Sequence, residues 1–410
     1  MAVIVQKYGG TSVGSLNRIE VVAENIIKTR QQGHQVVAVI SAMAGETNRL
    51  LSLARSLDKQ ASNRELDMLL STGEQVSIAL LAIALIKRGY SAVSLLAHQV
   101  GIITDNHFSR AHIKTVKTQR LAQSLEQEQV VLVAGFQGVD QEGNVTTLGR
   151  GGSDTSAVAI AVALGASECQ IFTDVDGIYT ADPRIEKNAR KLDQISFAEM
   201  LMMANLGAKV LHNRSVAYAM QHNLPIRVLN SFIDTDSYDS SGTKVTDDEI
   251  ELAKNNHLVS NIAHQQNQVL ISLSKIKNAV HINALLQAFT DEGIELDMLT
   301  QIQKSTTEFL LTFSITKHAH AKALQLITEY CRFAAILSND NVAKLSVIGA
   351  KLQSVDDILA QALTVLSQKN ITVYSLASSD IHHSFMVDSA DLFKGVHALH
   401  NTFKLNLLEY

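Results

Sequence analysis

The first 230 residues alternate two hydrophobic patterns, and this alternation restricts the fold more than any other feature of the sequence. Short apolar runs rich in β-branched residues occur at Val36–Ile40, Val93–Leu96, Val130–Val133, Gln170–Phe172 and Ile226–Leu229. Longer stretches of helical periodicity lie between them, at Leu16–Gln31, Arg64–Arg88, Ser153–Leu164 and Lys209–Gln221. Strands that alternate with helices indicate a mostly parallel sheet with helices on both faces. Residues 1–230 are therefore predicted to form one α/β domain.

The pattern changes after residue 230. Turn-forming Asp, Ser, Thr and Gly dominate the start of the next segment, so residues 231–262 are predicted to be a linker. Residues 263–336 and 337–410 then each follow the order strand, helix, strand, strand, helix. In the first unit the strands are expected at Val269–Leu273, Glu295–Leu299 and Phe309–Ile315, and the second unit repeats the pattern from Ala343–Ile348 onward. The repeat predicts two small α+β units.

Composition excludes several classes of protein. The 410 residues carry 35 basic and 40 acidic side chains, with no Lys/Arg block, which argues against a nucleic-acid partner. Cys169 and Cys331 are far apart in sequence and suggest a reducing compartment. The longest apolar stretch, near Ile78–Ile86, is too short to cross a bilayer. We therefore expect a cytoplasmic protein with no membrane partner.

The N-terminal segment has the pattern of an anion-binding turn. A buried strand over Val3–Val5 leads to Lys7 and then to Gly9 and Gly10. Glycines allow close approach of the backbone to an anion and permit positive φ. One residue of the pair Thr11–Ser12 would cap the next helix, whose free N–H groups attract negative charge. The alternative is an ordinary strand–turn–helix with a solvated lysine.

Three further segments strengthen the prediction of a site for charged ligands. They are Ser71–Glu74, Gly149–Asp154 and Thr173–Arg184, and they combine glycine turns, two arginines and several carboxylates. Such a set suits a charged metabolite bound together with a magnesium nucleotide. Neither a Walker-type lysine motif nor a dinucleotide-binding fingerprint is present in the sequence.

These segments resemble the motifs of the aspartate kinases, within the amino acid kinase superfamily. The matching stretches are Lys7–Val13, Ser41–Asn48, Ser71–Glu74, Ala134–Gly138, Gly149–Asp154 and Thr173–Arg184. The resemblance implies an amino acid kinase fold over 1–230 and two ferredoxin-like ACT units over 263–410. It also implies transfer of the γ-phosphoryl group of MgATP to the side chain of L-aspartate, which gives 4-phospho-L-aspartate. This reaction is the first step toward lysine, threonine, methionine and diaminopimelate.

The resemblance also implies a role for each motif residue. Lys7 would stabilise the transferring phosphoryl group and Asp154 would orient Lys7 or the metal-bound phosphates. Arg150 would pair with a substrate carboxylate and Glu74 would hold the ammonium group. Substrate contacts would also come from Ser41, Thr47 and Ser153, and nucleotide contacts from Lys7, Tyr8, Gly9, Gly10, Thr173, Asp174, Tyr179, Arg184 and Lys209. Mg²⁺ would be held mainly through the nucleotide phosphates, and no metal-ligand set is predicted on the chain.

Ordinary structural roles remain open for three of these residues. Lys7 is alternatively a solvated surface lysine, and Glu74 is alternatively a helix-end carboxylate in a surface ion pair. Asp154 is alternatively an acidic residue that stabilises the first turn of a helix. Two functional rivals also remain. One is a kinase for another small carboxylate such as glutamate, and the other is an amino-acid-binding regulatory protein without catalysis.

The C-terminal units depart from the family pattern. ACT units of the family usually carry an Asp-x-Pro-Gly-x-Ala turn that holds a feedback amino acid, whereas this chain has Lys277–Ile282 at the matching place. Lys277 stands at the acidic position, and both the proline and the glycine are replaced. In the second unit, Ser354–Leu359 replaces the glycine-containing turn. We therefore expect inhibition by lysine or threonine to be weakened, absent or altered, and the paired units to serve mainly in a homodimer.

Overall fold

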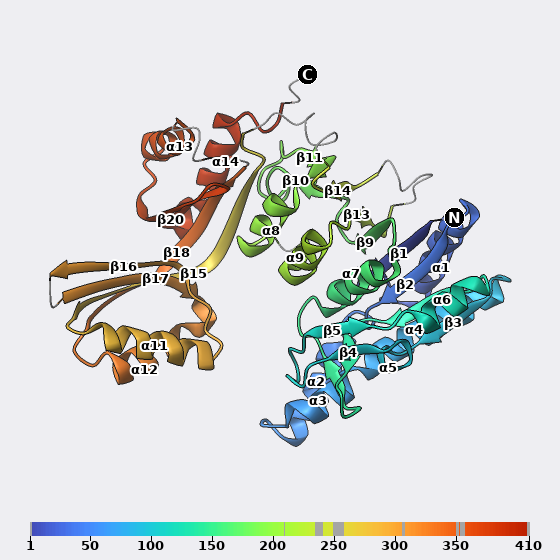
Figure 1. The fold of residues 1–410 in the computed structure, drawn as a ribbon. Helices are drawn as coiled ribbons and strands as arrows, with labels where there is room; N and C mark the ends of the chain where they lie inside the picture. Colours follow the sequence, from blue (N-terminus) through green and yellow to red (C-terminus); the bar gives the residue numbers. More distant parts are fainter. Residues whose placement is uncertain are drawn as a thin grey trace. The chain divides into compact units, whose positions relative to one another are not determined.

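The structure is a computed structural model that describes residues 2–208, 210–233, 241–248, 258–305, 308–349, 352 and 357–407. The chain divides into two compact units, each of which is described by itself (Figure 1). Unit 1 comprises Met1–Ile178, Lys191–Ala204 and Lys209–Asn255, and unit 2 comprises Tyr179–Arg190, Asn205–Ala208 and Asn256–Tyr410.

Unit 1 is built on an eight-stranded sheet with the order β12-β14-β13-β9-β1-β2-β6-β3. Its strands are β1 (Val3–Tyr8), β2 (Gln35–Ile40), β3 (Ala92–Leu95), β6 (Val130–Ala134), β9 (Glu168–Thr173), β12 (Gln194–Ile195), β13 (Ile226–Asn230) and β14 (Thr243–Val245). Every neighbouring pair is parallel except β13 and β14. The mostly parallel sheet predicted from the alternating pattern is confirmed.

Helices cover both faces of this sheet, because its central strands are apolar on both sides. The helices α1 (Leu16–Gln31) and α4 (Thr72–Lys87) pack on one face, in a core that includes Tyr8, Leu132 and Phe172. The helix α7 (Gly152–Leu164) contacts β1, β2 and β9 and packs beside α9 (Asn213–Gln221). Side chains that alternate along β1 therefore meet different helices.

Several elements of unit 1 are absent from the sequence prediction. A four-stranded sheet has the order β5-β4-β7-β8, with β4 (Ile102–Thr104), β5 (Ile113–Val116), β7 (Gln137–Val139) and β8 (Val145–Thr147). The short strands β10 (Ile178–Tyr179) and β11 (Lys191–Leu192) form a further pair. The additional helices are α2 (Glu46–Leu57), α3 (Asn63–Leu70), α5 (Ala97–Val100), α6 (Gln119–Glu126) and α8 (Phe197–Asn205).

The predicted linker over 231–262 is wrong for the strand β14. Thr243 is fully buried, and its Oγ accepts a hydrogen bond from the backbone N–H of Ile178 at 2.8 Å. Residues 243–245 pair with β13, which makes them part of the main sheet. The surrounding Ser, Gly and Asp residues concealed a strand of only three residues.

One helical stretch of the described residues, Asn63–Lys87, is long and apolar enough to cross a membrane by length and composition. This exceeds the apolar stretch recognised in the sequence. Of its most apolar window, 56% is buried inside the structure. A core helix of this kind passes the same test, and α4 contributes Ile78, Leu81 and Leu85 to the core that also contains Tyr8.

Unit 2 contains a six-stranded antiparallel sheet with the order β16-β17-β15-β18-β20-β19. Its elements follow the chain as β15 (Asn261–Ile276), α11 (Ala279–Asp291), β16 (Asp297–Ser305), β17 (Glu308–Thr316), α12 (His320–Tyr330), β18 (Ala335–Ile348), α13 (Asp357–Gln368), β19 (Val373–Ser378), β20 (His382–Asp388) and α14 (Leu392–Thr402). The order strand, helix, strand, strand, helix occurs twice, as predicted. The long strands β15 and β18 pair with each other and join the two repeats into one sheet.

A segment from the first 230 residues is part of unit 2. Ala181 packs in the same core as Leu345, Phe385 and Leu399. Thr180 bonds the ring of the fully buried His400, with 3.0 Å between Oγ and Nε2. Residues 179–190 are therefore anchored to the second α+β repeat, although the motif to which Tyr179–Arg184 belongs begins in unit 1.

Candidate active site

The candidate site in unit 1 lies where the parallel strands end. β1 ends at Tyr8, β2 at Ile40 and β9 at Thr173, and the predicted motifs follow directly after them. Open α/β sheets bind their ligands outside the carboxyl ends of the strands, where loops and helix N-termini converge. The sequence motifs of unit 1 are brought to this edge by the topology alone.

Lys7 and Asp154 form the central charged pair of this site. Lys7 is on β1 and Asp154 is in the first turn of α7, and the distance from Nζ to Oδ1 is 2.6 Å. Only 13% of the Lys7 side chain and 11% of the Asp154 side chain are exposed. The pair therefore holds the ammonium group in a fixed place, which a solvated surface lysine would not have.

Tyr8 lies on the opposite face of β1 from Lys7. Its ring is fully buried and stacks on Phe172, with 4.5 Å between the centroids and 13° between the planes. Adjacent residues of a strand point to opposite sides, so the placement of Lys7 toward α7 sends Tyr8 into the core with α1 and α4. The prediction that the Tyr8 side chain contacts the nucleotide is therefore wrong.

Gly9 and Gly10 follow β1, but not with the predicted conformation. Neither has a positive φ. The N–H of Gly9 donates to the carbonyl of Phe172 at 3.3 Å, so it does not point at a ligand. A Cβ at Gly10 would lie 2.9 Å from the carbonyl oxygen of Ala42. Close approach of two loops, rather than a left-handed turn, explains the glycine at position 10.

The cap of α1 also differs from the prediction. Ser15, not Thr11 or Ser12, is the N-cap and accepts a hydrogen bond from the N–H of Arg18. Ser12 is buried, and its hydroxyl bonds that of Ser231 at 2.8 Å, which ties the β1 turn to the end of β13. The prediction failed because three turn residues separate Ser12 from the first residue of the helix.

The turn that carries Arg150 depends on its glycines. Gly149 and Gly151 have φ of 77° and 67°, where other residues are strained. A Cβ at Gly151 would also lie 2.2 Å from Cγ of His212. This turn presents Arg150 to solvent and places Ser153 in a buried position at the start of α7.

His212 was not predicted as a site residue. Its side chain caps α9 by accepting the N–H of Arg214. Burial lowers the pKa of the His212 imidazole, while the nearby Asp154 acts in the opposite direction. The sequence signal was weak, since a single histidine four residues into a predicted helix reads as an ordinary helical residue.

Glu74 is the other buried charged group of the site. It lies in the first turn of α4 and is 3% exposed, and its Oε1 accepts the N–H of Ala42 at 3.0 Å. The second oxygen, Oε2, is buried without a hydrogen-bond partner. Burial raises the pKa of Glu74 to about 7, against the lowering effect of the Ala42 hydrogen bond. A carboxylate with one fixed and one free oxygen is suited to receive a cationic ligand group.

The loop after β2 supplies the two predicted hydroxyl residues. Ser41 and Thr47 are both partly buried, and the N–H of Ser41 donates to the carbonyl of Tyr8 at 3.1 Å. A Cβ at Gly73 would lie 2.8 Å from Cβ of Ala42, so α4 begins in direct contact with this loop. Ser41, Thr47 and Glu74 are therefore on adjoining segments of unit 1.

The predicted nucleotide-binding residues do not all belong to one unit. Thr173 ends β9 and the exposed Asp174 follows it, both in unit 1. Tyr179 and Arg184 belong to unit 2, and Arg184 is exposed with its guanidinium bonded to Asp182 at 2.9 and 2.7 Å. Lys209 lies outside the described residues.

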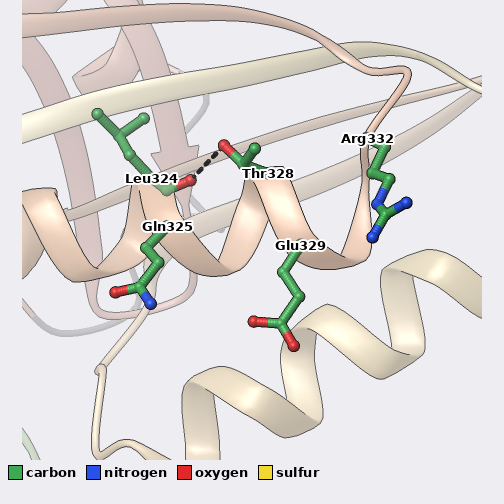
Figure 2. Close-up of a pocket in the computed structure, with 5 residues that line it drawn as sticks. All are labelled: Leu324, Gln325, Thr328, Glu329 and Arg332. Atoms are coloured by element: carbon green, nitrogen blue, oxygen red, sulfur yellow. Dashed lines mark hydrogen bonds between the residues drawn. The ribbon is translucent and has the colours of Figure 1, made fainter.

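A surface depression of about 510 Å³ lies elsewhere, on helix α12 of unit 2 (Figure 2). Its lining residues are Leu324, Gln325, Thr328, Glu329 and Arg332. The hydroxyl of Thr328 donates to the carbonyl of Leu324 within the helix, at 2.8 Å. None of the predicted catalytic or substrate residues lines it, so it is separate from the candidate site.

Two family models match the chain. The model of the amino acid kinase family matches residues 2–230, and an ACT domain model matches residues 337–401. The first match covers the motifs that converge in unit 1 and extends into the 179–190 segment. The second covers the second strand–helix repeat of unit 2.

Curated relatives and solved structures match over the full length. An aspartate kinase of Stutzerimonas stutzeri is 43% identical and an aspartokinase of Pseudomonas aeruginosa is 42% identical, each over 99% of this chain and 98% of the relative. The crystal structure of E. coli aspartokinase III in complex with aspartate and ADP is 27% identical, with a TM-score of 0.77 and coverage of 99% and 100%. The same enzyme in complex with lysine and aspartate gives a TM-score of 0.75 at 26% identity, with coverage of 98% and 99%. This chain therefore belongs to the aspartate kinases, within the amino acid kinase family.

Proposed function

We propose that this chain transfers the γ-phosphoryl group of ATP to the side-chain carboxylate of L-aspartate, giving 4-phospho-L-aspartate and ADP. The observation that carries the proposal is the 2.6 Å ion pair between Lys7 and Asp154 at the end of β1. Phosphoryl transfer needs positioned positive charge where charge accumulates on the moving group. Lys7 supplies this charge, and Asp154 fixes its orientation.

Glu74 and Arg150 hold the amino acid substrate. The free, buried oxygen of Glu74 receives the ammonium group of aspartate, because a cation there compensates the cost of a buried charge. The exposed guanidinium of Arg150 pairs with a carboxylate of the substrate, for which its planar fork is suited. Ser41, Thr47 and Ser153 supply polar contacts around the same substrate.

The reaction requires no general base on the protein. A side-chain carboxylate with an ordinary pKa of about 3.9 is already ionised at neutral pH, so its oxygen attacks the γ-phosphorus directly. The bond to the bridging oxygen breaks and ADP leaves with the electron pair. Lys7 and the α7 N-terminus offset charge on the transferred group. Bound Mg²⁺ would add charge neutralisation on the phosphates. Asp154 is engaged by Lys7, so the metal is held mainly through the nucleotide.

Nucleotide contacts come from Thr173 and Asp174 in unit 1, with Gly9 and Gly10 shaping the loop beneath the phosphates. Tyr179 and Arg184 join them when the nucleotide is bound, which asks Arg184 to exchange its contact with Asp182 for one with the ligand. Arg184 is 87% exposed, and a surface ion pair of this kind costs little to break. Lys209 remains a predicted contact.

The activity is tested with the purified full chain, MgATP and L-aspartate. ADP release and hydroxylamine trapping of the acyl phosphate should both depend on aspartate. L-Glutamate serves as the matched acceptor, since it differs by one methylene, and it should react poorly. Equal turnover with glutamate would favour the kinase of another carboxylate. Aspartate binding without ADP release would favour a regulatory protein.

Regulation by lysine or threonine is proposed to be weak or altered. Lys277 is exposed just before α11, and Asn278 caps this helix through a hydrogen bond to the N–H of Val280. A cation at this turn would repel the ammonium group of an effector. E. coli aspartokinase III, in contrast, has been solved in complex with lysine. Strong inhibition by either amino acid at millimolar concentration would contradict the proposal.

We also propose that unit 2 mediates a homodimer and that the protein works in the cytoplasm. The edge strand β16 exposes Leu299 and Ile302, and β18 exposes Leu337. An exposed apolar edge strand is open to pairing with a second chain. The two buried, free cysteines are consistent with a reducing compartment. Light scattering of the purified chain should give twice the monomer mass of 44.6 kDa.

A further inference from the structure

Three metal-ligating side chains gather in a loop of unit 1 that the proposed reaction does not use. Asp105, His107 and His112 belong to the loop that joins β4 to β5, and one ligand atom of each lies within 4.8 Å of the others. The N–H of Asp105 donates to the carbonyl of His112 at 3.1 Å and closes the base of the loop. The two histidines are therefore held near the same carboxylate by the backbone.

The geometry of the three groups is close to that of a coordination sphere. Oδ2 of Asp105 lies 3.1 Å from Nδ1 of His112 and 3.3 Å from Nδ1 of His107. In a tetrahedral zinc site with bonds of 2.0–2.1 Å, neighbouring ligand atoms are about 3.3 Å apart. Both imidazole nitrogens thus already stand at ligand spacing from one carboxylate oxygen.

The carboxylate is fixed by groups behind it. Oδ1 of Asp105 accepts the N–H of His107 at 3.3 Å and that of His112 at 3.1 Å, which leaves Oδ2 directed at the rings. Burial opposes ionisation of Asp105, but hydrogen bonds from His112 and His107 outweigh it and lower its pKa to about 2. The ligand is consequently an anion throughout the neutral range. Fixed outer contacts of this kind orient metal ligands.

We propose that Asp105, His107 and His112 form a surface site for one divalent transition metal ion of the zinc class, with water in the open position. Imidazole nitrogens favour such ions over Mg²⁺ or Ca²⁺, which prefer oxygen. The rings of His107 and His112 are 63% and 57% exposed, so the ion can enter from solvent. Lys114 is the opposing cation, with Nζ 3.8 Å from Oδ2, and its exposed side chain can move away.

Metal binding would stabilise a loop that supports the Arg150 turn. The N–H of Ser109, within the loop, donates to Asp67 at 2.8 Å, and the N–H of Ala111 donates to the carbonyl of Thr147 at 2.9 Å. The carbonyl oxygen of Ser109 lies 3.0 Å from the place of a Cβ at Gly149. An ion that joins two ends of this loop removes freedom mainly from the unfolded chain.

The test is zinc titration of the full chain after chelator treatment, with isothermal calorimetry and thermal melting as readouts. The wild type should bind one equivalent of Zn²⁺ in the micromolar range or tighter and melt at a higher temperature with zinc. The double variant His107→Gln/His112→Gln should lose affinity by at least the roughly 10- to 100-fold typical of outer-contact changes. His98→Gln is the matched control, since His98 is an exposed histidine outside the cluster, and it should bind as the wild type does.

Cobalt provides an independent readout. Co²⁺ should give visible d–d absorption bands with the wild type that the double variant lacks. Equal zinc stoichiometry and affinity in the double variant would overturn the proposal, as would binding only at millimolar zinc. The histidine variants leave Asp105 and its backbone hydrogen bonds in place, so circular dichroism should report a folded protein.

Discussion

At the scale of the residue, Lys7 and Asp154 act as one unit. Removing the Lys7 charge leaves Asp154 without its partner and the moving phosphoryl group without its nearest cation. We expect Lys7→Met to lower kcat by about 10²–10³, the cost typical of losing one preorganised stabilising group. Lys59→Met is the matched control, because Lys59 is exposed on the surface and should leave kcat unchanged.

The double variant Lys7→Met/Asp154→Asn separates a joint role from two independent ones. Residues that act together give strongly non-additive effects, so the double variant should be no slower than Lys7→Met alone. Steady-state kinetics of the four proteins measures this directly. Additive losses would show that Asp154 acts on the substrate by itself rather than through Lys7.

Glu74 gives a second prediction at this scale, on stability. Its pKa is raised from 4.5 to about 7 in the folded protein, a rise worth roughly 3 kcal/mol. A raised pKa means that the folded state binds the proton better, so this contribution is present below pH 4.5 and is lost as pH rises through about 7. Glu74→Gln should therefore increase the free energy of unfolding of the ligand-free protein at pH 8, by about 1–3 kcal/mol.

Chemical denaturation at pH 8 and pH 5 measures the effect, and the gain should vanish at pH 5. Glu186 is the matched buried carboxylate with the opposite sign. Burial acts to raise its pKa, but hydrogen bonds from Asn188 and His397 lower it. Glu186→Gln should therefore destabilise the protein at pH 8. The Glu74→Gln protein should also have a higher KM for aspartate, and an unchanged KM would remove Glu74 from the substrate site.

At the scale of the element, the start of α7 is fixed by Gly151. This residue combines a φ of 67° with a Cβ position 2.2 Å from His212, so Gly151→Ala introduces both strain and a clash. The expected loss in the free energy of unfolding is roughly 2–5 kcal/mol. Gly89→Ala is the control, because Gly89 has a φ of 83° and no atom within 4 Å of its Cβ position, and only about 1–2 kcal/mol should be lost.

The variant Gly151→Ala/His212→Ala isolates the clash. Removing the imidazole should restore part of the stability that Gly151→Ala loses, while the cost of the left-handed φ remains. Thermal melting of the single and double variants measures the difference. Equal stability of Gly151→Ala with and without His212 would mean that the two positions do not compete for space.

Sequence patterns predicted the long elements well and the short ones poorly. The helix Leu16–Gln31 and the repeated order of unit 2 follow from periodicity over ten or more residues. Strands of three residues, such as β4, β7 and β14, carry too few residues for a period to be recognised. Tyr8 was assigned to the nucleotide because it lies in a motif, although the alternation along β1 already placed it opposite Lys7. Glu74 and Lys7 could be predicted as candidates, whereas the role of His212 depends on a contact across 61 positions.

At the scale of the whole molecule, one sequence motif belongs to both units. Thr173–Ile178 are part of unit 1, and Tyr179–Arg190 are part of unit 2, where they are bound through Thr180 and His400 and through Glu186 and His397. No local pattern predicts this, because the partners of Thr180 and Glu186 lie more than 200 residues away. The motif that resembled a nucleotide-binding loop therefore also serves as a structural segment of the C-terminal unit.

The distribution of buried histidines predicts that acid destabilises unit 2 more than unit 1. Burial is the largest cause of a lowered pKa for five histidines, His212 in unit 1 and His264, His382, His383 and His400 in unit 2. A lowered pKa means that the unfolded chain binds the proton better. The stability that neutral histidines contribute is therefore present above pH 6.5 and is lost as pH falls below it. In unit 1 the protonation of Glu74 acts in the opposite direction over the same range.

Hydrogen exchange at pH 7.5 and pH 5.5, expressed as protection factors for peptides of each unit, measures this difference. Protection of β15 and β18 should fall more between the two pH values than protection of β1 and β9. His400→Gln should reduce the acid sensitivity of unit 2, since it removes a fully buried titrating group. Equal loss of protection in the two units would contradict the prediction. It would then follow that the carboxylates with lowered pKa, rather than the histidines, control the response to acid.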